Sequence, residues 1–113
     1  MRTNCFELQV DDPNAVAICL RVPDWYKGRR YLRLAPSMGN FLQHKRDGDW
    51  KKFAARYKRE TLLPLDPHIV ARDLGSDAIL LCWELPGDNC HRRLVAEWLQ
   101  NALDIEVPEA YTL

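Results

Sequence analysis

Residues that can react with a ligand or bind one gather in a short stretch of the sequence. Cys82 and Glu84 follow an apolar run, and Cys90, His91 and Arg92 come after a loop rich in turn residues. We expect this second group to open a helix, where unpaired N–H groups bind anions and favour a thiolate. The stretch is therefore the leading candidate for a functional site.

Three kinds of chemistry fit this cluster. Cys90 can be a nucleophile assisted by His91, although adjacent residues on a helix point about 100° apart. Cys82, Cys90 and His91, with Glu84 as a further donor, have the right types for a structural zinc site, but their spacing matches no standard zinc motif. The helix start and Arg92 can also hold a phosphate or another anion without reacting with it.

A purely structural interpretation competes with all three. In it, Cys90 fills space at the start of the helix, and His91 hydrogen-bonds to the loop. Arg92 and Arg93 are then surface charges, and Arg93 pairs with Glu97 four residues later.

A second group of candidate ligand-binding residues lies in an irregular segment nearer the N-terminus. Arg21, Trp25, Lys27 and Arg29 mix cations with an aromatic ring. Such mixtures can stack on bases and hold phosphates, so we predict a pocket between 21–29 and 82–92. The alternative is a structured loop that Trp25 pins against the core.

The elements that position these residues follow from apolar patterns and turn signals. Near-continuous apolar runs are typical of strands buried on both faces, and helices between such strands indicate parallel neighbours with helices on both faces. Ligands bind beyond the carboxyl ends of such strands, here at Arg21–Tyr26 and Cys82–His91. We predict strands at Cys5–Val10, Ala15–Val22, Ala78–Trp83 and Ile105–Val107, and helices after Ser37, after Asp49, after Asp66 and over Cys90–Leu103.

The fold class that we expect is α/β, in one domain over residues 1–113. It is a small three-layer, Rossmann-like domain with a mostly parallel sheet of three to four strands. The length of 113 residues and the apolar fraction of 47% suit a single soluble core. The apolar runs fall far short of the roughly 20 residues that cross a bilayer, and the first residues lack a secretory pattern. We therefore expect a cytoplasmic protein with reduced thiols and no membrane partner.

The net charge is zero, but the charges are unevenly distributed. Residues 21–60 hold 12 basic and 4 acidic residues, and the remainder is correspondingly acidic. A basic face of this kind attracts a nucleotide, a nucleic acid or an acidic protein partner, and it can equally be a set of solvated helix faces. The oligomeric state does not follow from the sequence.

The site stretch also resembles a known family. Leu80-Leu81-Cys82-Trp83-Glu84 followed by Cys90-His91-Arg92 is similar to the L-L-C-x-E and C-H-R signature of the "domain of unknown function 488" family. Val22–Gly28, Leu34–Ser37 and Leu65–Pro67 resemble its small phage and bacterial members. The resemblance implies a Rossmann-like fold and no established activity.

The leading hypothesis is that this protein binds an anionic ligand, a nucleotide or a nucleic-acid element, with cysteine-dependent chemistry at the same pocket. The rival is a non-enzymatic interaction module that docks an acidic protein through its basic face. The sequence does not decide whether the protein is an enzyme, and the leading hypothesis includes no cofactor or metal ion. Its candidate catalytic residues are Cys90, His91 and Glu84, and its candidate ligand-binding residues are Arg21, Trp25, Lys27, Arg29, Cys82 and Arg92.

Overall fold

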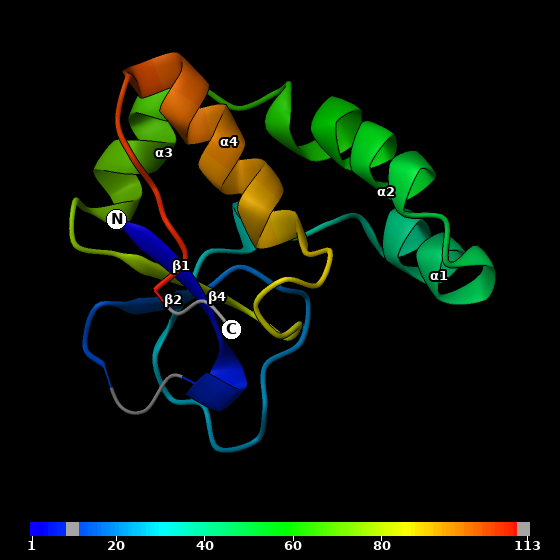
Figure 1. The fold of residues 1–113 in the computed structure, drawn as a ribbon, viewed down its shortest axis with the longest axis horizontal. Coiled ribbons are helices and arrows are strands. Elements are labelled where there is room, and N and C mark those ends of the chain that lie inside the picture. Colours follow the sequence, from blue (N-terminus) through cyan, green and yellow to red (C-terminus); the bar gives the residue numbers. More distant parts are fainter. Residues whose placement is uncertain (9–11, 111–113) are drawn as a thin grey trace.

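A four-stranded parallel sheet is the centre of the fold. The computed structural model describes residues 1–8 and 12–110. In it the strands lie in the order β1-β4-β2-β3, and every neighbouring pair is parallel (Figure 1). The predicted α/β fold with a mostly parallel sheet is therefore confirmed. The strands are β1 (Arg2–Cys5), β2 (Ala15–Ala17), β3 (Arg29–Arg30) and β4 (Ile79–Cys82).

The helices predicted after Ser37, Asp49 and Asp66 are confirmed. The side chains of Ser37, Asp49 and Asp66 each accept a backbone N–H in the first turn of a helix, which satisfies a donor that has no partner within the helix. Gly48 has a φ of 61°, a left-handed conformation that ends α1 and lets α2 begin directly afterwards. The helices are α1 (Met38–Asp47), α2 (Trp50–Tyr57), α3 (Pro67–Leu74) and α4 (His91–Leu103), with shorter turns η1 (Phe6–Leu8), η2 (Leu32–Leu34) and the π-helical η3 (Lys58–Leu62).

The two faces of the sheet are covered differently. On one face, Val16 and Leu80 belong to a core that includes side chains of α2, α3 and α4. We expected helices on the other face as well, but there Phe6 of η1, with Val22 and Tyr26, packs on the sheet. The third layer is thus a short 3-10 turn and a loop.

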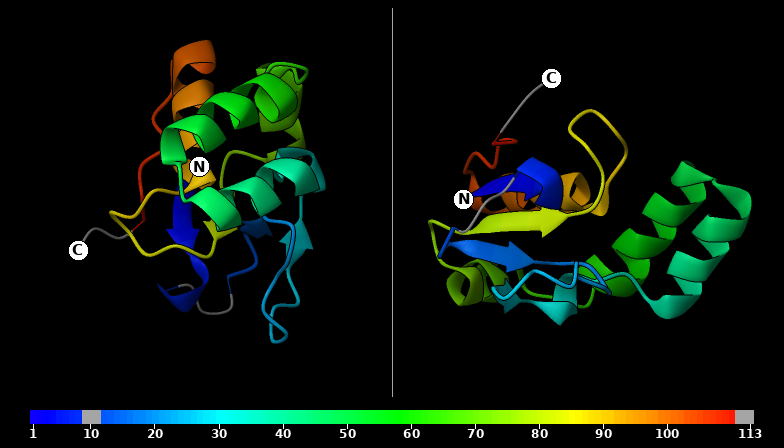
Figure 2. Two further views of the ribbon diagram at one scale, coloured as in Figure 1. Left: turned by 90° about the vertical axis from the view of Figure 1, so that its right-hand side faces the viewer. Right: turned by 90° about the horizontal axis from the view of Figure 1, so that it is seen from below.

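The α1–α2 hairpin lies beyond the carboxyl ends of the strands. The strand arrows point toward this hairpin when the molecule is seen from below (Figure 2). The loops that follow β2 and β4 therefore begin at the edge of the sheet that faces the hairpin. Within the described ranges, every helix is too short or too polar to cross a membrane.

The N-terminal strands differ from the prediction in extent. The chain leaves β1 after Cys5 because Phe6 turns onto the second face of the sheet in η1, and Val10 lies outside the described residues. The second strand ends at Ala17 instead of Val22. Ile18 still donates to the carbonyl of Leu81 at 3.1 Å before the chain turns away.

The predicted strand at Ile105–Val107 is wrong. Val107 is fully buried, and its carbonyl accepts a hydrogen bond of 2.8 Å from Arg93. A single parallel bridge to the sheet forms later, between Glu109 and Thr3. The apolar residues at this position indicate burial and not a strand, because the Val107 carbonyl accepts its hydrogen bond from the side chain of Arg93 and not from the backbone of a neighbouring strand.

Candidate active site at the carboxyl edge of the sheet

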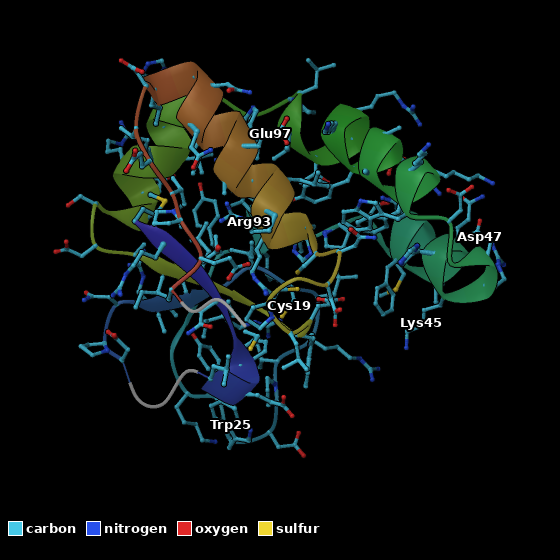
Figure 3. The ribbon with its side chains drawn as sticks, viewed as in Figure 1. Cys19, Trp25, Lys45, Asp47, Arg93 and Glu97 are labelled. Carbon is cyan, nitrogen blue, oxygen red and sulfur yellow. The ribbon has the colours of Figure 1, made fainter. Side chains whose placement is uncertain are left out.

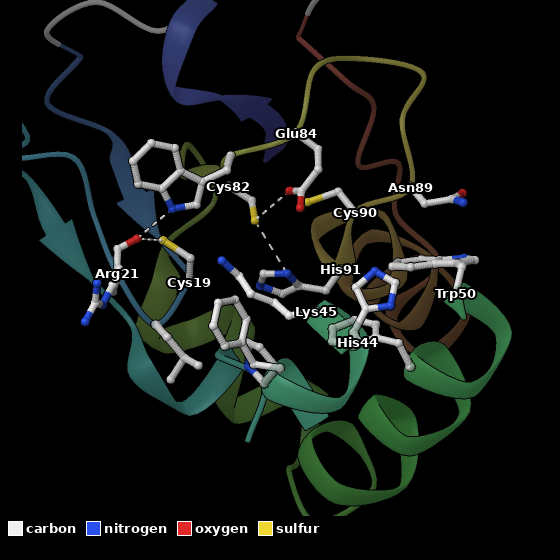
Figure 4. A pocket seen from close by; sticks show the side chains of 15 residues that line it. Cys19, Arg21, His44, Lys45, Trp50, Cys82, Glu84, Asn89, Cys90 and His91 are labelled. Carbon is white, nitrogen blue, oxygen red and sulfur yellow. Dashed lines mark hydrogen bonds between the residues drawn. The ribbon is translucent and has the colours of Figure 1, made fainter. Parts of the chain in front are cut away.

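A cavity of about 420 Å³ lies between the carboxyl edge of the sheet and the α1–α2 hairpin (Figure 4). This is the edge at which the parallel topology predicts a ligand site. The sheet side consists of the residues that follow β2 and β4 and those that open α4. The hairpin side consists of α1 and α2. The lining residues are Cys19, Leu20, Arg21, Pro36, Phe41, His44, Lys45, Trp50, Phe53, Cys82, Trp83, Glu84, Asn89, Cys90 and His91.

Two thiols and one imidazole meet on the sheet side of the cavity. Cys82 ends β4, Cys90 is the N-cap of α4, and His91 is the first residue of that helix. One donor atom from each of the three lies within 4.8 Å of the other two, and all three residues are buried. The Sγ atom of Cys82 is 3.5 Å from Nδ1 of His91. A group of this composition could hold a metal ion.

The backbone at the N-cap explains how His91 and its neighbour come together. Cys90 has φ −149° and ψ 143°, which is extended and not helical. The angular separation of adjacent residues on a helix therefore does not apply to this pair. The helical spacing used in the sequence analysis holds only from His91 onward, and therefore it does not predict that Cys90 and His91 come close together.

The orientation of His91 is set by the strand opposite. Its Nε2 lies 2.7 Å from the carbonyl oxygen of Ile18, directly after β2. Because a carbonyl can only accept, we assign a proton to Nε2, and Nδ1 is left facing the sulfur atoms. The ring also packs on Tyr57, with 5.3 Å between centroids.

Cys82 and Cys90 differ in acidity. Burial alone would raise the pKa of Cys90, but hydrogen bonds from Cys82 and His91 and the charges of His91 and Arg92 hold it well below its usual value. The hydrogen bond to Cys90, together with burial, raises the pKa of Cys82 well above its usual value. Burial alone would lower the pKa of His91, yet the interactions with Cys90 and with the Ile18 carbonyl raise it. The favoured state is a Cys90 thiolate beside a protonated His91 and a Cys82 thiol.

Glu84 stands beside this group. Its Oε2 accepts a hydrogen bond of 3.3 Å from the Cys82 thiol. Burial of its carboxyl group, with the negative charge of Cys90, raises the pKa of Glu84. Glu84 is thus a carboxyl group that can hold a proton at the cavity.

Arg92 lies behind the site and is fully buried. Its Nε donates to Glu109 Oε1 at 2.9 Å, and its Nη1 donates to the backbone carbonyl of Glu84 at 2.7 Å. It does not line the cavity. Its contribution there is a positive charge near Cys90 and a fixed position for the loop that carries Glu84.

Arg21 belongs to the cavity lining, and its backbone carbonyl organises part of that lining. The carbonyl oxygen accepts hydrogen bonds from Cys19 Sγ at 2.7 Å and from Trp83 Nε1 at 2.8 Å. The bond from Trp83 joins the loop after β2 to the loop after β4, and the bond from Cys19 lies within the first of these loops (Figure 4).

The other residues of the predicted second wall lie elsewhere. Trp25 and Lys27 line a separate cavity of about 370 Å³, and Arg29 donates to the last carbonyls of α3. Figure 3 shows Trp25 on the side of the molecule away from Lys45 of α1. The expected wall is wrong because the chain after Pro23 turns onto the second face of the sheet, where Trp25 packs against Phe6.

The α1–α2 hairpin supplies the second wall instead. Trp50 stacks on Phe53 with 5.3 Å between centroids, and His44 lies against both rings. Lys45 extends into the cavity, with its Nζ 5.2 Å from the centroid of the Phe41 ring (Figure 4). Trp50 and Phe53 stand three residues apart in the sequence, and this helical spacing is the same whether an apolar stripe faces a cavity or a core.

Comparisons with known proteins bear on the family of this chain and not on the geometry of its site. No curated protein and no solved structure matches the chain. A family model, DUF488-N3a, described as the active DUF488-N3 subclade, matches residues 6–103. The resemblance seen in the L-L-C-x-E and C-H-R motifs is thereby confirmed. With most of its length matched, the protein belongs to the family known as domain of unknown function 488, in its N3 subclade.

Proposed function

We propose that this protein binds a small anionic ligand in the cavity and that Cys90 attacks it as a nucleophile. The observation that carries the proposal is the placement of Cys90. It is a buried thiol at the N-terminus of α4, it lines the cavity, and Cys82 and His91 surround it. A nucleophilic cysteine needs a neighbouring base or cation and access to a ligand.

Each neighbour of Cys90 has a separate task in this proposal. His91, oriented by the Ile18 carbonyl, takes the thiol proton and can return it to a leaving group. The single proton of the Cys82 thiol can go either to Glu84 or to the Cys90 thiolate, and in the second case it stabilises the thiolate. Glu84, whose pKa is raised, is a second group that can give or take a proton near Cys82.

The proposed ligand is anionic because of the charges that line the cavity. Among the described lining residues, Glu84 is the only acidic one, whereas Lys45 and Arg21 are cations. Lys45 has no carboxylate at ion-pair distance within residues 1–8 and 12–110. Its charge is therefore available to a ligand.

The size and the aromatic lining of the cavity favour a nucleotide or a single extruded base over a duplex. A volume of about 420 Å³ falls within the range of small-molecule sites. Phe41, Trp50 and Trp83 offer ring faces on which a base can stack, and Lys45 offers a cation for a phosphate.

The test uses two small electrophiles that differ in charge. Iodoacetamide and iodoacetate react with the same thiolate, which displaces iodide from carbon, but only iodoacetate is anionic. The full chain is treated with each in the presence of a reductant and a chelator, and the modified cysteine is identified by peptide mass spectrometry. We expect Cys90 to be modified first. The fast phase should be lost in Cys90→Ser and kept in Cys19→Ser, which removes another thiol of the same cavity.

The charge of the ligand is tested with Lys45→Met. The ratio of the iodoacetate rate to the iodoacetamide rate should fall by about fivefold, since two unit charges 4 Å apart in water interact by about 1 kcal/mol. Lys51→Met removes the same charge from the same hairpin outside the cavity lining, and it should leave the ratio unchanged. Equal ratios in the two variants, or a Cys90 that reacts no faster than Cys19, would overturn the proposal.

A further inference from the structure

One pair of donor atoms in the cluster has the spacing of a tetrahedral metal site, and the third donor lies nearby. With Zn–S bonds of about 2.3 Å and Zn–N bonds of about 2.0 Å, tetrahedral geometry separates a sulfur from a nitrogen ligand by about 3.5 Å. Cys82 Sγ and His91 Nδ1 are 3.5 Å apart, and one donor atom of Cys90 lies within 4.8 Å of both other residues. We propose that Cys82, Cys90 and His91 bind a thiophilic divalent cation of the zinc class.

The surroundings of His91 are those of a metal ligand. A histidine that binds a metal through one ring nitrogen usually donates its other N–H to a carbonyl or carboxylate, which fixes the ring and the tautomer. Nε2 of His91 makes this contact with the Ile18 carbonyl at 2.7 Å. The ring therefore needs no reorientation to present Nδ1 to an ion near the two sulfur atoms.

The composition of the cluster selects the ion. Two thiolates and an imidazole suit zinc, whereas magnesium and calcium prefer oxygen donors. Glu84 adds an oxygen atom 3.3 Å from Cys82 Sγ, so a fourth donor is close to the cluster. An ion bound here would also occupy the Cys90 lone pair that attacks an electrophile, so metal binding and nucleophilic reaction exclude each other.

Cobalt(II) is the probe, because its tetrahedral thiolate complexes absorb visible light, whereas the corresponding zinc complexes do not. Full-length protein, freed of metal with a chelator and kept reduced, is titrated with Co²⁺. We expect the thiolate-to-cobalt absorption of a tetrahedral site to saturate at about one equivalent per chain, and Zn²⁺ to displace the signal. Zn²⁺ should also slow the reaction of iodoacetamide with Cys90 by at least tenfold in the wild-type chain.

The variants separate this cluster from the other thiols. Cys19→Ser should keep the cobalt spectrum, whereas Cys90→Ser and His91→Asn should lose its intensity or weaken binding by at least about tenfold. Circular dichroism establishes that each variant is folded. If Cys90→Ser does not fold, the protection of Cys90 by Zn²⁺ in the wild-type chain decides the question. A spectrum without thiolate absorption, one that persists in folded Cys90→Ser, or an absence of protection by Zn²⁺ where Cys90 reacts in the metal-free chain would overturn the proposal.

The proposed metal site and the proposed nucleophile are tested by separate measurements, so that one can be wrong while the other holds. Alkylation in the presence of a chelator tests the nucleophile, and cobalt absorption tests the metal site. A chain that binds cobalt but whose Cys90 is inert toward both electrophiles without metal would support the metal site and contradict the proposed function.

Discussion

Cys90 and Cys19 line the same cavity from two regions of the fold, and their acidities are shifted in opposite directions. Both are buried, with exposed fractions of 2% and 4%. Burial raises the pKa of Cys19 to about 11, and its thiol donates to the Arg21 carbonyl at 2.7 Å. Cys90 is surrounded by donors and cations, and its pKa is lowered. The partner of a buried thiol, and not burial itself, therefore decides whether it ionises.

The difference arises from the elements that carry the two residues. Cys19 follows β2, where the chain turns and carbonyls are the nearest polar groups. Cys90 opens α4, where the thiol lies at the positive end of the helix dipole and beside His91 and Arg92, whose charges lower its pKa. In the same cavity, the loop after β2 therefore keeps the Cys19 thiol protonated, whereas the start of α4 favours the Cys90 thiolate.

The largest expected effect is on the pH profiles of the two thiols. A thiolate exists above its pKa, so the alkylation rate of Cys90 should fall only as the pH drops through its lowered pKa, well below the pH at which Cys19 ionises. The rate of Cys19 should still be rising toward pH 11, because at pH 7 only on the order of one molecule in ten thousand carries that thiolate. Site-resolved mass spectrometry with iodoacetamide and a chelator measures both. If the alkylation rates of Cys90 and Cys19 had the same pH midpoint, the two regions would not differ in how they shift a thiol pKa.

The next effect concerns His91. His91→Asn removes the imidazolium beside Cys90, and the midpoint for Cys90 alkylation should move up by about one pH unit, since a neighbouring opposite charge lowers a pKa by about one to three units. The midpoint of Cys19 should not move.

The matched control is His44→Asn, which removes a second histidine from the lining of the same cavity. This variant should leave both midpoints where they are. If the pH midpoint of Cys90 alkylation moved as far in His44→Asn as in His91→Asn, the cavity as a whole would set the acidity of Cys90.

The smallest effect tests whether the contrast depends on the hairpin. Asp49→Ala removes the N-cap of α2 and should lower the free energy of unfolding by about 1 kcal/mol, as measured by urea denaturation. Asp66→Ala, which removes the equivalent cap of α3, should cost a similar amount. Neither change should alter the thiol profiles, because the groups that shift the pKa of Cys90 lie on β4 and α4. If the pH profiles of Cys90 and Cys19 became alike in Asp49→Ala but not in Asp66→Ala, the difference in acidity between the two thiols would depend on the α1–α2 hairpin.

The sheet side of the site was predictable from the sequence, but the hairpin side was not. Cys82 and Cys90 follow local signals, an apolar run and a helix start, and parallel topology sends both to one edge. The position of Lys45 depends on how a whole hairpin docks, which leaves no local pattern. The segment with Trp25 has the composition of a ligand loop, and only its packing on Phe6 reveals that it covers the other face.

The strand order also constrains when the site can form. β1 and β2 pair with β4 and not with each other, so the centre of the sheet stays open until the ribosome has made Cys82. Insertion of β4 then closes contacts that are distant along the chain, which is a slow step in folding. His91 contacts the Ile18 carbonyl only when α4, which follows β4 along the chain, has also docked on the sheet. A nascent chain therefore carries Cys19 and Cys82 as ordinary thiols, and the acidic Cys90 exists only once folding is complete.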